Sequence, residues 1–252
     1  MPAFRGVRIE ERQVAMKIQM IEHDPYFGVN NIDLWADENG HQVERTFIGA
    51  KERPGPPELD TFDWLILMGG AQHAWEDDLY PWLIEEKRFI GRALSAGKPV
   101  LGICFGTQLL AEVMGGRVFA MEDKEIGWHE IRINEAGRAS WLFDGLPGIF
   151  TSFHFHGDHY DLPGGLASLA QSPPSPNQAF VAPGPTVGLQ FHPEYTLDNV
   201  RWSIKQYGSL WQKGPHVPGP DKTAELTEAM PDTYWLMAAL LDNIVARFGE
   251  AS

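Results

Sequence analysis

Apolar and polar positions follow two rhythms in the first half of the chain, and together they predict strands and helices in turn. The runs 16–21 and 62–68 have the length and the apolar pattern of strands, and 43–48 is a weaker strand. The segments 31–39 and 80–96 repeat apolar residues at helical spacing, and each is followed by a glycine that ends a helix. This alternation predicts a doubly wound α/β fold with a mostly parallel central sheet.

After Gly116 the pattern changes to short strands separated by turns, which is typical of antiparallel additions to a sheet. We expect these strands at 117–120, 130–133, 150–155, 166–171, 179–181 and 187–191. Two helical stretches then follow, over 201–212 and 224–248.

This pattern divides the chain into three parts. Residues 1–13 form a polar leader, 14–200 form the α/β domain, and 201–252 form a helical appendage packed on the same domain. The tryptophans and leucines of the appendage indicate extra core that covers a sheet edge. A homo-oligomer surface is the alternative.

Composition narrows the class of protein. Hydrophobic residues make up 43% of the chain and aromatic residues 12%, which is enough for a sizeable core. The net charge of −14 argues against nucleic acid or an anionic membrane as the main partner. A single cysteine excludes an internal disulfide, and we find neither a secretory signal nor an apolar run that could span a membrane. These features predict a cytoplasmic protein.

The one cysteine lies where chemistry is expected in such a fold. The apolar run 100–104 ends in Cys104 between Gly102 and Gly106, and a helical pattern starts directly afterwards. The unpaired N–H groups and partial positive charge of a helix N-terminus favour a nucleophilic thiolate. The alternative is a buried thiol that acts as a small apolar side chain.

A nucleophilic cysteine needs a base, and the base needs an orienting group. His192 ends a predicted strand two residues before Glu194, so in an extended segment both side chains share one face. Alternatively, the pair is a solvent-exposed histidine beside an ordinary surface glutamate.

Acyl chemistry also needs hydrogen-bond donors for an oxyanion. The backbone N–H groups of Phe105, directly after the cysteine, and of Gly70, at the neighbouring strand end, are candidates. A plain turn is the alternative explanation for Gly69 and Gly70.

A second group of histidines raises the question of a metal. His154, His156 and His159 lie close in sequence, but no helix spaces them at i, i+4, and the cysteine ligands typical of structural zinc are absent. We therefore expect no metal, and interpret this segment as a strand end that lines a pocket.

These motifs together resemble the class I (triad) glutamine amidotransferase family. The segment 102–108 fits the family's G-x-C-x-G-x-Q, and 191–194 reads Phe-His-Pro-Glu. Supporting segments occur in the family's order and spacing at 68–70, 124–128, 156–158 and 176–180. The resemblance covers about residues 65 to 195.

The resemblance implies a flavodoxin-like fold and a Cys104–His192–Glu194 triad that needs no cofactor. Cys104 would attack the side-chain amide of glutamine, form a γ-glutamyl thioester, and release ammonia and then glutamate. The positions expected to contact the substrate are Gln108, His156, Gly157 and Asp158.

Two departures from the family pattern bear on function. Many members carry proline where this chain has Ala71, which leaves the backbone N–H groups in place. We find no G-x-x-x-x-G-K-[ST] phosphate loop and no room for an ATP-binding synthetase, so ammonia would pass to a separate synthetase partner. The alternatives are a γ-glutamyl peptide or amine hydrolase that uses the same triad, and a non-catalytic regulatory protein on this fold.

Overall fold

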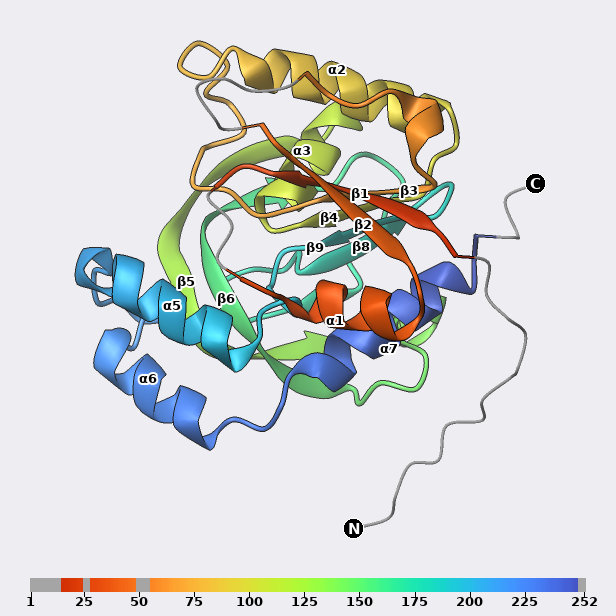
Figure 1. The fold of residues 1–252 in the computed structure, drawn as a ribbon. Coiled ribbons are helices and arrows are strands. Elements are labelled where there is room, and N and C mark those ends of the chain that lie inside the picture. The colour runs from red at the N-terminus through yellow and green to blue at the C-terminus, as the bar shows by residue number, and fades with distance from the viewer. Residues whose placement is uncertain (1–14, 25–27, 49–54, 249–252) are drawn as a thin grey trace.

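A nine-stranded sheet lies between helices in the computed structural model, which describes residues 15–24, 28–48 and 55–248 (Figure 1). The strands are β1 (Lys17–Glu22), β2 (Gln42–Phe47), β3 (Trp64–Leu67), β4 (Val100–Ile103), β5 (Arg117–Ile133), β6 (Ile149–Asp161), β7 (Ala170–Gln171), β8 (Ala179–Ala182) and β9 (Thr186–Leu189). The α-helices are α1 (Asn31–Glu38), α2 (Trp82–Ser95), α3 (Phe105–Val113), α4 (Glu135–Arg138), α5 (Leu197–Tyr207), α6 (Pro220–Ala229) and α7 (Tyr234–Val245).

The sheet has a parallel half and an antiparallel half. Its order is β2-β1-β3-β4-β9-β8-β7-β5-β6. The pairs from β2 to β9 are parallel, and those from β9 to β6 are antiparallel. The expected doubly wound α/β fold with antiparallel additions is therefore confirmed.

The central strands are buried on both faces because their side chains alternate between two cores. Trp64 and Ile66 of β3 pack in a cluster with residues of α1 and α7. Leu65 and Leu67 of the same strand face the opposite cluster, which is built on α2 and α3. Figure 1 shows α2 and α3 on one side of the sheet and α1 and α7 on the other.

The two strands expected at 117–120 and 130–133 and the helix expected over 224–248 differ from the structure. One long strand, β5, replaces the two short strands expected at 117–120 and 130–133. Its register with β6 shifts between Ala120 and Glu125. The polar residues between them therefore form an irregular part of one continuous strand and not a turn. The single helix expected over 224–248 is wrong: α6 and α7 are separated around Pro231, which cannot continue a helix.

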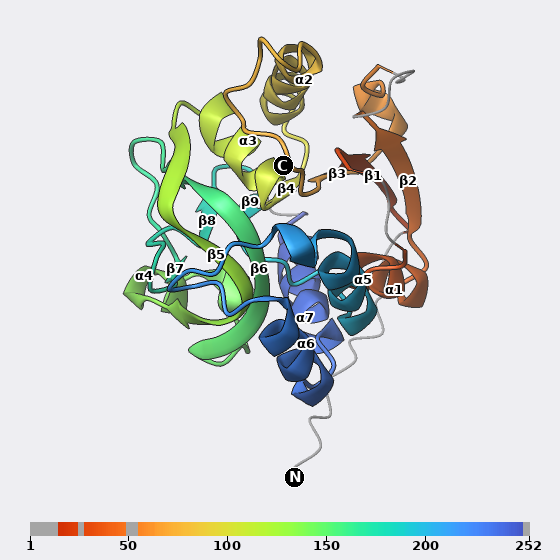
Figure 2. The same cartoon turned by 90° about the vertical axis from the view of Figure 1, so that its left-hand side faces the viewer.

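The C-terminal helices pack on the rest of the chain. The boundary expected between residues 200 and 201 lies within α5, which begins at Leu197 after the side-chain cap of Thr196. Figure 2 shows α5, α6 and α7 grouped beside β5 and β6, and Trp128 Nε1 of β5 donates to Thr227 Oγ1 of α6 at 2.9 Å. The predicted leader 1–13 lies outside the described residues.

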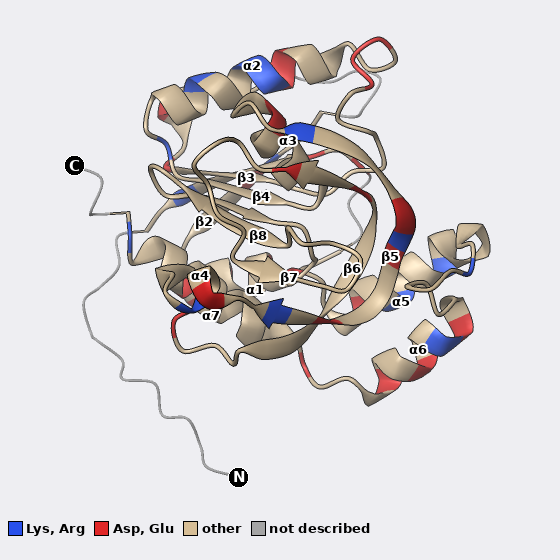
Figure 3. Ribbon diagram, turned by 180° about the vertical axis from the view of Figure 1, so that it is seen from behind, with Lys and Arg blue, Asp and Glu red and all other residues tan. Residues whose placement is uncertain are grey.

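Charged residues of both signs are interspersed along α2, β5 and α6 (Figure 3), so these elements present no continuous basic face. Among the helices that the structure describes, none has the length and apolar character needed to cross a membrane.

Candidate active site

Three neighbouring strands end where the sequence-predicted chemistry lies. In the parallel sheet β4 is flanked by β3 and β9. Just beyond their carboxyl ends lie Gly69 and Gly70 after β3, Cys104 after β4, and His192 after β9. In open α/β sheets, ligands bind at this edge. The fold thus brings together residues that are more than 120 positions apart in the chain.

The backbone of Cys104 holds a conformation that L-residues rarely adopt. Its φ is +51°, and among the described residues it is the one non-glycine residue with positive φ. The turn is fixed by the N–H of Cys104, which donates to the Leu189 carbonyl at 2.7 Å, and by that of Gly106, which donates to the Met68 carbonyl at 3.1 Å. Helix α3 begins at Phe105, so the thiol lies at its N-terminus.

The two glycines around Cys104 are required by close backbone approach. A Cβ on Gly106 would lie 2.2 Å from the Leu67 carbonyl oxygen of β3. A Cβ on Gly102 would lie 2.6 Å from the Gly106 carbonyl oxygen. Neither backbone contact could yield without moving a strand or α3, so only glycine fits at these two positions.

His192 and Glu194 form the pair that their spacing predicts. His192 Nδ1 donates to Glu194 Oε1 at 2.7 Å, and both side chains are buried. Burial disfavours a charged imidazole, but the charges and hydrogen bonds of Glu194 and Cys104 outweigh it and raise the pKa of His192 to about 10. The alternative of an exposed histidine beside a surface glutamate is excluded.

The glycines after β3 lie against the cysteine turn. A Cβ on Gly69 would lie 3.2 Å from His192 Cε1 and 3.8 Å from Cys104 Cβ. A Cβ on Gly70 would lie 2.9 Å from Phe105 Cδ1. The two residues predicted to supply oxyanion donors, Gly70 and Phe105, are therefore neighbours beside the thiol.

A cavity of about 430 Å³ opens beside these residues. All four positions expected to contact a substrate line it: Gln108, His156, Gly157 and Asp158. The carbonyl of Asp158 accepts from Gln108 Nε2 at 3.3 Å and from His156 Nδ1 at 3.0 Å. The helix after Cys104 and strand β6 are thereby tied together along the cavity wall.

The carboxylate of Asp158 has a protein partner that the sequence did not indicate. His73 Nδ1 donates to Asp158 Oδ2, and Asp158 Oδ1 has no hydrogen-bond partner among the described residues. The His73 ring stacks on Trp75 at 4.7 Å between centroids. His73 therefore lies on the cavity wall.

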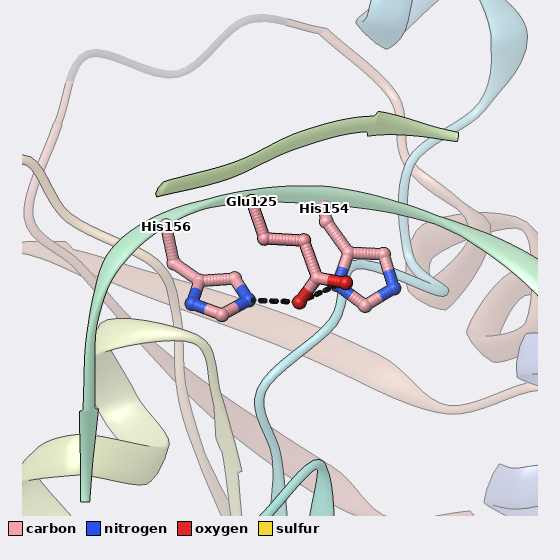
Figure 4. A group of neighbouring side chains, drawn as sticks. All are labelled: Glu125, His154 and His156. Atoms are coloured by element: carbon pink, nitrogen blue, oxygen red, sulfur yellow. Dashed lines mark hydrogen bonds and ion pairs between the residues drawn. The ribbon is translucent and has the colours of Figure 1, made fainter. Parts of the chain in front are cut away.

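Glu125 is the centre of a buried polar network on β5 and β6. Its Oε2 lies 3.1 Å from His154 Nδ1 and 3.1 Å from His156 Nε2 (Figure 4). The same oxygen accepts from Gln178 Nε2 at 2.8 Å and from Ser172 Oγ at 3.0 Å. Burial opposes a charged carboxyl, but the two histidines lower the pKa of Glu125 below its usual range.

This network changes the question of a metal. One ligand atom each of Glu125, His154 and His156 lies within 4.8 Å of the others. His159 is not part of this group and packs instead against the Phe119 ring, 4.3 Å away between centroids. Because the shared Glu125 oxygen already receives hydrogen bonds, we assign no metal to it, and the absence of a metal stays a prediction.

Two buried polar residues of the site were missed at the sequence level. His23 follows the carboxyl end of β1, and Glu86 lies on α2; His23 Nε2 is 2.8 Å from Glu86 Oε1. Glu86 could have been found from the sequence, because it lies on the apolar face of α2 between Leu83 and Phe89. A carboxylate on such a face is buried and needs a polar partner.

Comparisons with known proteins agree with this architecture. The family model "Glutamine amidotransferase class-I" matches residues 36–203. The glutamine amidotransferase-like protein YfeJ of Salmonella typhimurium is 30% identical over 193 residues, which cover 75% of this chain and 80% of YfeJ. The glutamine-hydrolyzing GMP synthase of Thermomicrobium roseum is 40% identical over 134 residues, covering 52% of this chain but only 23% of that enzyme.

A solved structure agrees over nearly the whole chain. The structure of a glutamine amidotransferase from Thermotoga maritima matches with a TM-score of 0.80 and 27% identity, covering 94% of this chain and 99% of the other. The resemblance carried by the cysteine and histidine motifs is confirmed, and the chain belongs to the class I glutamine amidotransferase family.

Proposed function

We propose that the protein hydrolyses the side-chain amide of glutamine through a Cys104–His192–Glu194 triad and a γ-glutamyl thioester. One observation carries the proposal: the buried His192 imidazole hydrogen-bonds the Glu194 carboxylate, and both residues line the same cavity as Cys104. A nucleophile, a base and a group that orients the base thus lie at one site, which supports the triad.

In the first step the Cys104 sulfur attacks the γ-carbonyl carbon, and a C–S bond forms while the carbonyl π electrons move to oxygen. The N–H groups of Gly70 and Phe105 stabilise that oxyanion. When the intermediate collapses, the C–N bond breaks and the protonated His192 gives its proton to the leaving nitrogen. Ammonia departs and the thioester remains.

In the second step water attacks the thioester. Neutral His192 takes a proton from the water, a second oxyanion forms in the same place, and the C–S bond breaks. The sulfur leaves as a thiolate that pairs again with protonated His192, and glutamate is released. Glu194 keeps the imidazole oriented throughout and stabilises its charged form.

The substrate's amino-acid end would lie against Gln108 and the 156–158 segment. Asp158 is the candidate partner for its α-ammonium group, because one of its carboxylate oxygens has no hydrogen-bond partner among the described residues. The ammonia would pass to a synthetase partner, since relatives that align with this chain include GMP synthases named as glutamine-hydrolyzing. We place this reaction in the cytoplasm.

The cavity favours a second candidate, a γ-glutamyl peptide or amine hydrolase. Its volume of about 430 Å³ lies in the range of sites for drug-sized ligands, which exceed one amino acid. Phe155, Trp202 and Tyr207 contribute aromatic rings to its lining, and such rings suit a larger leaving group.

A side-by-side assay of glutamine, glutathione and γ-glutamyl amines separates these candidates. Glutamate release from glutamine, increased when a candidate synthetase is added, supports the amidotransferase. Strong release from γ-glutamyl peptides by the protein alone supports the hydrolase. No release from any of them by the wild-type protein contradicts both and leaves the non-catalytic alternative.

A further inference from the structure

His23 contacts several parts of the proposed active site from one buried position. It is 2% exposed and follows β1. Its Nδ1 lies 3.2 Å from the carbonyl oxygen of Gly69, and its Nε2 lies 2.8 Å from Glu86 Oε1. The ring also packs edge-on against Phe105, with 4.9 Å between centroids. His23 therefore connects α2 to Gly69 and to Phe105, which both lie beside Cys104.

The contacts of His23 bear on its protonation. A carbonyl oxygen and a carboxylate oxygen are hydrogen-bond acceptors, so these two contacts favour a proton on each ring nitrogen. Burial disfavours this charged ring, but Glu86 and the Gly69 carbonyl outweigh burial and raise the pKa of His23. The charges of Glu86 on α2 and of Asp24, the next residue along the chain, both favour the protonated ring.

The hydrogen bond to Gly69 also orients Gly70. The carbonyl of residue 69 and the N–H of residue 70 belong to one planar trans peptide, so they point in opposite directions. A donor fixed on the carbonyl therefore sets the direction of the N–H.

We propose that His23, held by Glu86, is a positioning residue that keeps the Gly70 N–H directed at the oxyanion of the γ-glutamyl intermediate. The inference rests on the proposed function and extends it, because it identifies the side chains that preorganise the oxyanion hole. Preorganised donors act when charge develops in the transition state. Loss of this positioning should therefore lower kcat more than it raises KM.

Two double variants isolate the donor to Gly69. His23→Asn/Glu86→Leu and His23→Leu/Glu86→Leu both remove the buried charged pair, and asparagine and leucine share the same branched shape. Only the asparagine offers an N–H near the former Nδ1. We expect kcat of the asparagine variant to exceed that of the leucine variant by about 10-fold or more, with KM within about twofold. Glu85→Gln, an exposed neighbour on α2, should leave both constants unchanged.

Crystal structures of the two double variants give a readout that does not depend on turnover. The 69–70 peptide should keep its orientation in the asparagine variant and turn or lose its single orientation in the leucine variant. Equal kcat values, or the same ordered peptide in both structures, overturn the inference. Failure of the proposed function looks different: wild type and Cys104→Ala would then release glutamate equally, while the peptide orientation still tests the role of His23.

Discussion

Nδ1 of His192 lies 2.7 Å from Oε1 of Glu194, and both side chains are buried. The carboxylate fixes which ring nitrogen faces it and leaves the other for Cys104. It also supplies charge that holds a proton on the imidazole against the effect of burial. This pair thus sets both the orientation and the charge of the proposed acid.

Replacing Glu194 by glutamine keeps the size of the side chain and removes its charge. We expect kcat to fall by roughly 10²-fold or more, the scale of general acid–base catalysis. The alkaline limit of activity, near the His192 pKa of about 10, should move to lower pH because a cause of the raised pKa is gone. Measurement of kcat against pH checks both, with exposed Asp198→Asn as the control. An unchanged profile contradicts the assigned role.

Stability should depend on the same proton. The pKa of His192 is about 10 in the folded protein and 6.5 ordinarily, so its contribution is fully present below pH 6.5. It is lost as pH rises from 6.5 to 10. Urea unfolding at several pH values should show the free energy of unfolding falling across this range, and falling less in His192→Gln. Equal slopes for the two proteins would refute this.

The positive φ of Cys104 predicts an inverted order of two variants. At ordinary positions alanine is more stable than glycine, but at a φ of +51° a Cβ costs about 1–2 kcal/mol. The free energy of unfolding of Cys104→Gly should therefore exceed that of Cys104→Ala by about 1 kcal/mol. Both lack the sulfur and differ only in the Cβ. The denaturant midpoints of the two variants test this prediction. A higher midpoint for Cys104→Ala than for Cys104→Gly would show that the turn is not strained.

Gly106 and Gly91 should respond oppositely to the same substitution. A Cβ on Gly106 would meet the Leu67 carbonyl oxygen at 2.2 Å, so Gly106→Ala should reduce the free energy of unfolding by about 3 kcal/mol or more. On Gly91 the nearest atom would be Val113 Cγ1 at 3.8 Å, and the added methyl favours α2 by up to about 1 kcal/mol. Thermal unfolding of the two variants tests this, and similar shifts would contradict the proposed close approach.

The turn at Cys104 could be predicted from the sequence because its determinants are local. An apolar run, two glycines and an immediate helical pattern fix the strand, the turn and the helix start. The His192–Glu194 pair is also local, since two residues in an extended segment share a face. The break between α6 and α7 was readable too, because Pro231 lies between them.

The remaining features depend on partners distant in sequence. His23 and Glu86 are 63 positions apart, and nothing near either residue shows that the fold brings them together. The same holds for Glu125, whose network gathers residues from several strands and a loop. The length of β5 was missed because the polar residues between Ala120 and Glu125 resemble a turn, whereas pairing with β6 continues on both sides of the shift.

The central claim is that Cys104 carries a γ-glutamyl group during turnover. Its most direct test is acid quenching of the wild-type protein during reaction with the best donor from the substrate panel, followed by peptide mass mapping. The account predicts a γ-glutamyl thioester on the peptide that contains Cys104, and neither adduct nor glutamate release in Cys104→Ala. Glutamate release by Cys104→Ala at the wild-type rate would contradict it.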